Sequence, residues 1–188
     1  RIAFVARDSS ENNVKLWVRS LNAETAIPLK GTDDASFPFW SHDGEYLAFF
    51  ANGKLKKILS TGGPVLTICD ASQGRSGDWN RDDIIVFTPD YDGPLYMVPA
   101  AGGEANQLTQ LDSTQNEFTH RYATFLPDND HYLFFNRKES NSGGEKDAIC
   151  ISSISNPTVK HLLFAKSNPV YANGQLLFMR DDILMTQQ

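Results

Sequence analysis

Short runs of apolar and aromatic residues recur along the chain and are separated by polar turn sequences. The clearest run occurs five times, each time around a phenylalanine, with a period of about 43 residues: Ile2–Val5, Leu47–Phe50, Ile85–Phe87, Leu133–Phe135 and Leu176–Met179. Runs of this length between Asp-Gly, Asn-Gly and Gly-Gly pairs are typical of antiparallel hairpins, and no stretch has the periodicity of an amphipathic helix. The pattern predicts an all-β chain.

Two further markers recur in the same order around each run. One precedes the run (Phe39–Gly44, Asp78–Asp83, Thr124–Asn129, Val170–Gly174) and one follows it (Leu16–Arg19, Leu55–Ile58, Leu95–Val98, Ile149–Ile151, Leu184–Met185). In the best-defined repeat the markers predict strands A to D at 37–41, 46–51, 54–60 and 65–69. Four antiparallel strands in a period of about 40 to 45 residues are the signature of a β-propeller, whose blades pack face to face.

The repeat divides the chain, 1–188, into about four and a half blades of a single β-propeller segment. Complete four-stranded antiparallel blades are predicted at 36–76, 77–118 and 119–166, and partial blades at 1–35 and 167–188. The chain opens directly on a strand-like run without a methionine, so we expect it to be a segment of a longer protein.

Acidic and aromatic residues that recur in the repeats receive structural interpretations. Asp-Gly, Asp-Asp, Asp-Asn and Asn-Gly pairs close the A-to-B hairpins, where positive φ favours these residue types, and metal binding is disfavoured because each pair lies in a different blade. Five aromatic residues are predicted to pack between blades rather than to form a carbohydrate platform: Trp17, Trp40, Trp79, Phe125 and Tyr171.

Composition and charge exclude several classes of function. Acids outnumber bases 23 to 17, which argues against a nucleic-acid partner, and no apolar run reaches the roughly 18 residues of a membrane span. Cys69 and Cys150 lie in apolar runs, which favours free buried thiols over a disulfide. The four histidines show no metal-ligand spacing, and neither a metal nor a cofactor is predicted.

Catalytic motifs are absent from the sequence, which contains no GxSxG, Walker A, HExxH, HRD or DFG signature. Ser142–Lys146 has the look of a phosphate loop but lacks its spacing, and a flexible B-to-C connection explains its glycines more simply. The segment is therefore predicted to be non-catalytic, and its function is expected on a surface.

One face of the propeller offers candidate binding residues. The B-to-C and D-to-A connections of a meander emerge on the same side, here called the loop face, and the long ones lie at 8–13, 70–76, 111–119 and 137–147. Near the channel on this face we predict a site for a carboxylate or phosphate, formed by Arg75, Glu117, His120 and Arg121. The alternative is structural: Arg75 and Arg121 form inter-blade ion pairs with Asp78 or Glu117, and His120 is a packing residue.

The residues of the repeat also carry a family resemblance. Phe39–Phe49 resembles the W-S-P-D-G-x-x-I-A-F unit of TolB-type, WD-repeat-like propellers, with His42 where that motif has proline. Over nearly the whole chain, the sequence most resembles the C-terminal extracytoplasmic propellers of bacterial transmembrane serine/threonine protein kinases. The resemblance is carried by short segments such as Gly53–Lys56, Pro94–Glu104, His120–Tyr122, Phe125–Asp128 and Leu176–Arg180.

The resemblance implies a periplasmic or extracytoplasmic sensor or binding domain, with a kinase domain upstream beyond a membrane span. TolB-like propellers commonly have six blades, so the chain is expected to be part of a larger ring and to self-associate in isolation through its apolar end blades. A protein partner or a small anionic ligand is expected on the loop face. Two alternatives remain open: the gating propeller of a prolyl-oligopeptidase-type serine peptidase, and a TolB-like periplasmic scaffold.

Overall fold

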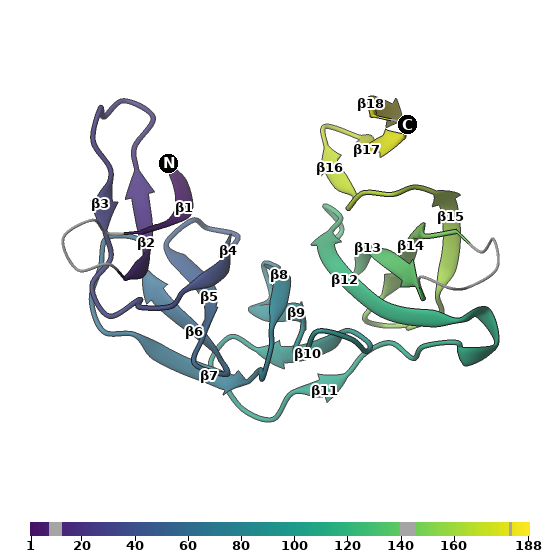
Figure 1. Cartoon of the computed structure of the whole chain (residues 1–188), viewed down its shortest axis with the longest axis horizontal. Coiled ribbons are helices and arrows are strands. Elements are labelled where there is room, and N and C mark those ends of the chain that lie inside the picture. The colour runs from purple at the N-terminus through teal and green to yellow at the C-terminus, as the bar shows by residue number, and fades with distance from the viewer. Residues whose placement is uncertain (8–12, 140–145, 181) are drawn as a thin grey trace.

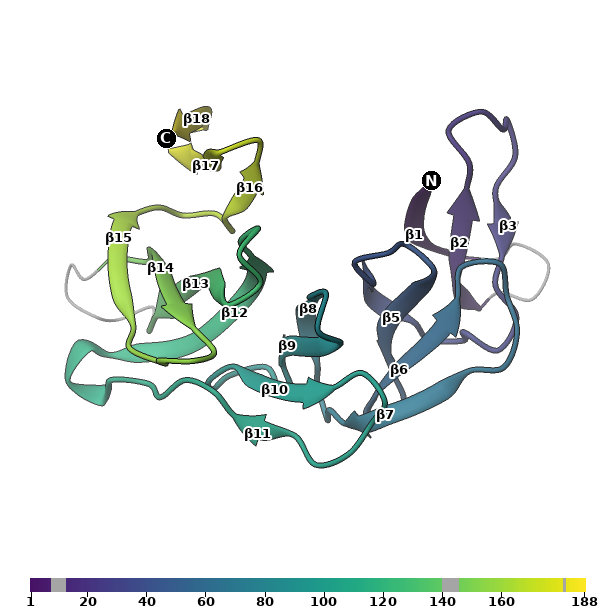
Figure 2. The same ribbon diagram turned by 180° about the vertical axis from the view of Figure 1, so that it is seen from behind.

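A computed structural model describes residues 1–7, 13–139, 146–180 and 182–188 and shows five antiparallel sheets in an open arc (Figure 1). The chain ends lie on the two opposite arms of the arc, and the view from behind shows the same arrangement (Figure 2). Most of the predicted connections 8–13 and 137–147, and Ser142–Glu145 of the loop that resembles a phosphate loop, lie outside the described residues.

The sheets follow the chain as successive meanders of neighbouring strands. The first sheet contains β1 (Ile2–Arg7), β2 (Val14–Arg19) and β3 (Ile27–Pro28), and the second β4 (Ser36–Trp40), β5 (Tyr46–Ala51), β6 (Lys54–Leu59) and β7 (Leu66–Asp70). The third contains β8 (Arg75–Trp79), β9 (Ile84–Thr88), β10 (Tyr96–Pro99) and β11 (Asn106–Gln107). The fourth contains β12 (Glu117–Phe125), β13 (His131–Lys138), β14 (Ala148–Ser153) and β15 (Lys160–Phe164), preceded by the 3-10 helix η1 (Ser113–Gln115). The fifth contains β16 (Val170–Ala172), β17 (Gln175–Arg180) and β18 (Ile183–Gln187).

The all-β propeller predicted from the repeat is confirmed, but the blade count is corrected. The sequence predicted about four and a half blades of a larger ring, whereas the described residues form five blades, three with four strands and two with three. Each terminal sheet has a continuous antiparallel ladder over its three strands. The first strand of each sheet lies on the inner side of the arc and the last on its outer side (Figures 1 and 2).

Both faces of the central sheets are buried, which explains why their strands are continuously apolar. Adjacent residues Phe49 and Phe50 of β5 belong to different core clusters, one shared with the first blade and one shared with the third. Two more clusters join the third blade to the fourth and the fourth to the fifth. Every pair of successive blades is therefore held by an apolar core, and this packing provides the main favourable contribution to folding.

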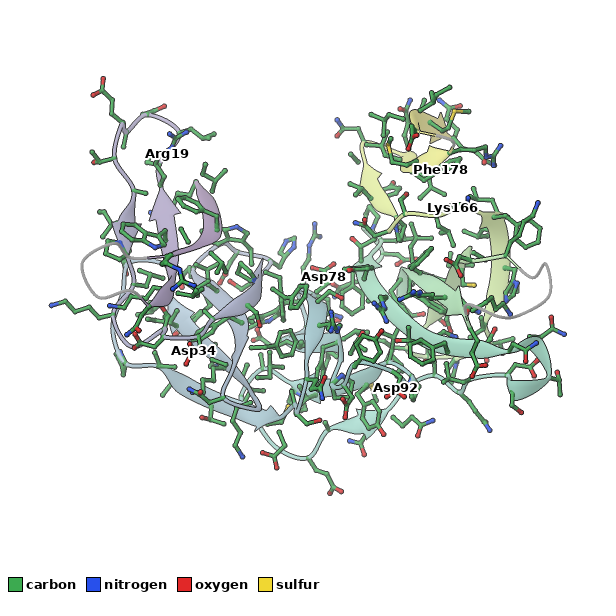
Figure 3. The ribbon with its side chains drawn as sticks, viewed as in Figure 1. Arg19, Asp34, Asp78, Asp92, Lys166 and Phe178 are labelled. Carbon is green, nitrogen blue, oxygen red and sulfur yellow. The ribbon has the colours of Figure 1, made fainter. Side chains whose placement is uncertain are left out.

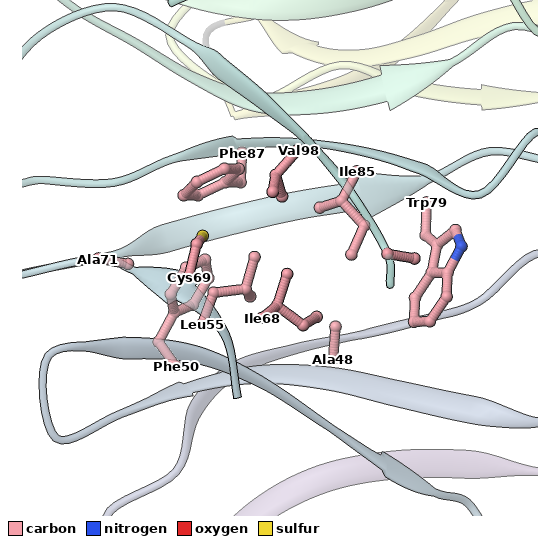
Figure 4. Packing of buried hydrophobic residues seen from close by; sticks show 11 residues of the cluster. Ala48, Phe50, Leu55, Ile68, Cys69, Ala71, Trp79, Ile85, Phe87 and Val98 are labelled. Atoms are coloured by element: carbon pink, nitrogen blue, oxygen red, sulfur yellow. The ribbon is translucent and has the colours of Figure 1, made fainter. Parts of the chain in front are cut away.

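The cluster between the second and third blades, drawn in Figure 4, contains more buried residues than each of the other three clusters. Phe50, Leu55 and Ile68 from the second blade meet Ile85 and Phe87 from the third, and the Phe50 and Phe87 ring centroids lie 6.2 Å apart. Trp79 closes the end of this cluster, and its indole Nε1 donates to Asp83 Oδ1 at 2.9 Å. The polar edge of the indole is satisfied at the turn while its rings remain in the core.

The predicted packing of aromatic residues between blades is confirmed for four of the five. Trp40, Trp79, Phe125 and Tyr171 each lie in or against a different inter-blade cluster, at matched positions on the first strands of their sheets. Trp17 does not match them, because it lies on β2 and its indole donates to the Ala6 carbonyl of the neighbouring strand.

The A-to-B turns have the predicted backbone geometry. Positive φ occurs at Gly44 (72°), Asp83 (57°), Asn129 (72°) and Asn173 (49°). The Asp43 carboxylate accepts from the Ser41 hydroxyl and the Glu45 amide within its own turn, and these hydrogen bonds lower the pKa of Asp43. Asp43 therefore stabilises its hairpin.

Both cysteines are free and buried, as predicted. Burial raises the pKa of Cys69 to about 11 and that of Cys150 to about 12. Thiols with such pKa values remain protonated near neutral pH and are poor nucleophiles.

Candidate functional site

The inner strands of the three central blades share a bulge that positions their side chains. The ladder shifts register after Ser36, Arg75 and Arg121, each four residues before the aromatic residue that packs between blades. The next residue in each strand, Phe37, Ser76 or Tyr122, has a positive φ of 46°, 48° or 57°. A bulge redirects the side chains beside it, and here it places Arg75 and Arg121 at equivalent points of neighbouring blades.

Arg75 and Arg121 meet at one tyrosine. Their guanidinium carbons lie 4.8 Å and 5.9 Å from the centroid of the Tyr91 ring, which belongs to the B-to-C connection of the third blade. Arg121 also donates from Nη2 to the Tyr91 carbonyl at 3.1 Å, and the Tyr91 ring contacts Phe118 edge-on with centroids 5.6 Å apart. The structure brings these two predicted site residues together at Tyr91, which the sequence analysis did not single out.

The charges of these arginines are not neutralised within the described part of the chain. No carboxylate there forms an ion pair with Arg75 or Arg121, and the Nε atoms of both are buried without a hydrogen-bond partner. Burial lowers the pKa of Arg121, and the positive charges of Arg137 and Arg75 lower it further. Arg75, Arg121, Arg137 and Tyr91 are here called the arginine cluster.

The ion pairs considered as the structural alternative are not formed. Asp78, labelled on the inner side of the arc in Figure 3, accepts from the backbone amides of Trp79 at 3.0 Å and Phe125 at 2.7 Å. Its carboxylate therefore links the inner strands of the third and fourth blades without contacting an arginine. The nearby Asp90 carboxylate accepts from the Ser72 hydroxyl and the Tyr91 amide.

Glu117 and His120 do not join the arginines. His120 is fully buried, with its ring centroid 4.7 Å from that of Phe134. Its Nδ1 lies 2.9 Å from the Thr109 hydroxyl, which accepts from the Leu95 amide, and its Nε2 lies 3.2 Å from Glu117 Oε2. Both ring nitrogens of His120 therefore have a polar partner inside the blade. His120 is a packing residue, as the alternative interpretation held.

Glu117 is the centre of a buried network within the fourth blade. Besides His120, its carboxylate accepts from the Asp112 amide and from the Asn136 side chain. Lys138 Nζ lies 3.5 Å from Oε1 without a hydrogen bond of its own, and His161 Nε2 lies 3.6 Å from the same oxygen. Glu117, His120, Asn136, Lys138 and His161 are here called the polar network.

The ionisation of Glu117 reflects these partners. Burial alone would raise its pKa, but hydrogen bonds from His120, the Asp112 amide and Asn136 lower the pKa to about 2. The carboxylate is consequently charged at all ordinary pH values and balances the Lys138 ammonium, whose side chain is only 5% exposed. The network contains a structural ion pair within the fourth blade.

The four predicted site residues thus belong to two separate groups. Sequence reasoning missed Tyr91, Arg137 and Lys138, which come from the connection after β9 and from β13. A detectable signal existed for Tyr91 alone, since an aromatic residue in the polar segment Asp90–Gly93 is unusual for a turn. Asp92, its neighbour, is labelled in Figure 3.

Comparisons with known proteins identify the fold. No family model matches the sequence, and no curated protein matches it. Among solved structures, TolB from Acinetobacter baumannii superposes with a TM-score of 0.69 at 17% identity, over 96% of this chain and 49% of that one. The chain has a TolB-like β-propeller fold. A putative TolB from Agrobacterium tumefaciens gives a TM-score of 0.70 at 10% identity, over 88% of this chain and 62% of that one.

A propeller domain of a protease is also similar to this chain. The β-propeller domain of the Trilobed protease from Pyrococcus furiosus matches with a TM-score of 0.57 at 14% identity, over 94% of this chain and 60% of that one. This chain spans about half to two thirds of the length of these three structures. In the described residues, no helix is long and apolar enough to span a membrane, and no three metal-ligating side chains cluster.

Proposed function

We propose that this propeller segment is a non-catalytic binding domain whose loop face captures a carboxylate or phosphate group through Arg75 and Arg121. The observation that carries the proposal is the convergence of two guanidinium groups from neighbouring blades on one ring, without a carboxylate partner in the described residues. Guanidinium groups bind such oxyanions with paired, charge-assisted hydrogen bonds. The Tyr91 ring lies beside both guanidinium groups, and the Tyr91 carbonyl accepts from Arg121 Nη2.

The domain is further proposed to act as the extracytoplasmic sensor of a membrane serine/threonine kinase. This proposal is supported by the similarity of sequence segments such as Pro94–Glu104 to the propellers of such kinases. The match to a protease propeller favours the gating domain of a serine peptidase as the second candidate, and the TolB matches favour a periplasmic scaffold as the third. In the complete gene, an upstream kinase catalytic loop would support the first, and a downstream G-x-S-x-G motif the second. A signal peptide without an enzyme domain would support the third.

Substitution of either arginine is expected to weaken anion binding. Titration calorimetry with citrate and with inorganic phosphate at low ionic strength should show a loss of roughly 10- to 100-fold for Arg75→Ala or Arg121→Ala, the scale of about 1.5 to 3 kcal/mol for one charge-assisted hydrogen bond. Arg121→Lys should recover only part of the affinity, because an ammonium cannot form the bidentate pair.

Arg81→Ala provides the matched control for charge. Arg81 lies in an A-to-B turn, where its Nε donates to His42 Nε2 at 2.9 Å, and its loss changes the net charge equally. Its substitution should leave citrate affinity unchanged. Equal weakening by all three alanine variants would show nonspecific attraction, and unchanged binding in the Arg75 and Arg121 variants would contradict the site.

A further inference from the structure

Two exposed aromatic rings lie beside Arg75, one from the arginine cluster itself and one from β4. Phe37 is 38% exposed and Tyr91 is 42% exposed, and the Arg75 guanidinium lies 5.8 Å from the first ring centroid and 4.8 Å from the second. We infer that the site accepts an acidic peptide segment of a partner protein, in which an aromatic or apolar side chain lies beside the carboxylates. This inference rests on the proposed function and specifies its ligand.

The composition of the surface favours a protein over a small anion. Aromatic residues and arginine dominate the binding energy of protein interfaces, and both types are present here in one contiguous group. Phosphate and citrate can use the guanidinium donors, but they have no apolar surface to place against the Phe37 and Tyr91 rings. A peptide with an apolar side chain uses both parts of the surface.

The rings are also held in position before any ligand binds. Tyr91 packs against Phe118 on one edge and carries the two guanidinium groups over its face. Aromatic side chains have few rotatable bonds, so little additional conformational entropy is lost when such a surface is covered. The arrangement is suited to binding without rearrangement.

The backbone of Phe37 lies in the bulge that the inner strands of the three central blades share. Its φ of 46° lies in the left-handed region, which glycine or asparagine would adopt more easily than a bulky residue. The strained residue carries a large apolar side chain that is substantially exposed, so the strain is not compensated by burial in a core. The bulge thus presents the Phe37 ring at the surface beside Arg75.

Charge complementarity defines the rest of the partner. The chain has a formal net charge of −6, yet Arg75 and Arg121 converge on Tyr91, and the positive charges of Arg75 and Arg137 both act on Arg121. An acidic segment neutralises them, and the acidic remainder of the chain disfavours a long polyanion such as a nucleic acid.

The inference is tested with two fluorescently labelled peptides in a polarisation assay. Both contain glutamates on either side of a central position, which is phenylalanine in one and alanine in the other. The phenylalanine peptide should bind the unmodified protein about tenfold more tightly. Phe37→Ala should abolish this preference while citrate affinity changes by less than about twofold. Phe164→Ala, at a 59% exposed ring on the outer strand β15, is the matched control and should change neither.

The outcomes separate this inference from the proposed function. Equal affinity for the two peptides, with citrate binding that still depends on Arg75 and Arg121, would overturn the peptide ligand and leave the anion site standing. Absence of citrate and peptide binding would overturn both. Displacement of the peptide by a single-stranded oligonucleotide of equal charge at lower concentration would favour a nucleic acid and contradict the inference.

Discussion

Replacement of Glu117 by glutamine is expected to reduce the free energy of unfolding by about 3 to 5 kcal/mol, the usual cost of breaking a buried ion pair. The substitution leaves the Lys138 ammonium, whose side chain is 5% exposed, without its counter-charge and weakens the acceptor for His120 and Asn136. Denaturant unfolding measures the loss. Glu139→Gln, the same change at an exposed residue of the adjoining connection, should cost less than about 0.5 kcal/mol.

The effect of Glu117 should depend on pH in a defined direction. Because folding lowers its pKa from the ordinary value of 4.5 to about 2, the carboxylate contributes stability that is complete above pH 4.5 and is lost as the pH falls towards 2. The difference in stability between the unmodified protein and Glu117→Gln should therefore shrink over this range. Glu117→Gln combined with Lys138→Met should recover stability, since the unpaired charge is removed. A constant difference between pH 6 and pH 3, or a loss below about 1 kcal/mol, would contradict the buried ion pair.

Substitution of Gly74 by alanine is expected to destabilise the protein by about 3 kcal/mol through a steric clash. A Cβ atom at this position would lie 2.0 Å from Cδ1 of the Phe50 ring, and that ring is fixed between Phe39 and Phe87 in the core of two blades. The ring has no space to move away, because protein interiors are close-packed. Thermal and denaturant unfolding both measure the effect.

A double substitution distinguishes the clash from a general effect of alanine. Phe50→Leu should cost stability alone but partly rescue Gly74→Ala, with a coupling energy of about 1 kcal/mol or more. Gly93→Ala is the control for backbone strain, since its Cβ would meet nothing within 4 Å although its φ is positive. If Gly74→Ala costs no more than Gly93→Ala, the ring is not fixed as described.

The strands, turns and inter-blade aromatic residues were predictable because the same local sequence patterns recur in successive repeats. Phe49 and Phe50 illustrate this, since an uninterrupted apolar run requires a sheet that is buried on both faces. The blade count was not predictable to the same degree. The pairing of Ile27–Pro28 with β2 completes the first sheet with only two residues, too few to give a periodic signal.

The candidate site was predicted in part, and strand geometry explains the division. His120 and Arg121 are consecutive, so their side chains point to opposite sides of β12. His120 lies opposite Asn136, and Arg121 lies opposite Phe135. Glu117 joins His120 because the ladder shifts register between Glu117 and Thr119. Neither the register shift nor the position of Tyr91 can be read from spacing, because both depend on how neighbouring strands and blades meet.

The alternation along β12 also restricts how this protein can change in evolution. Point substitutions at Arg121, which is only 5% exposed, leave the alternation of the strand intact, whereas insertion or deletion of one residue in the middle of β12 would exchange its two sides. Such a change would drive a guanidinium towards Phe134 and Thr109 and expel the imidazole that now fills this space. Length variation among descendants of this sequence should consequently be confined to the connections between strands, while the binding surface diversifies by substitution.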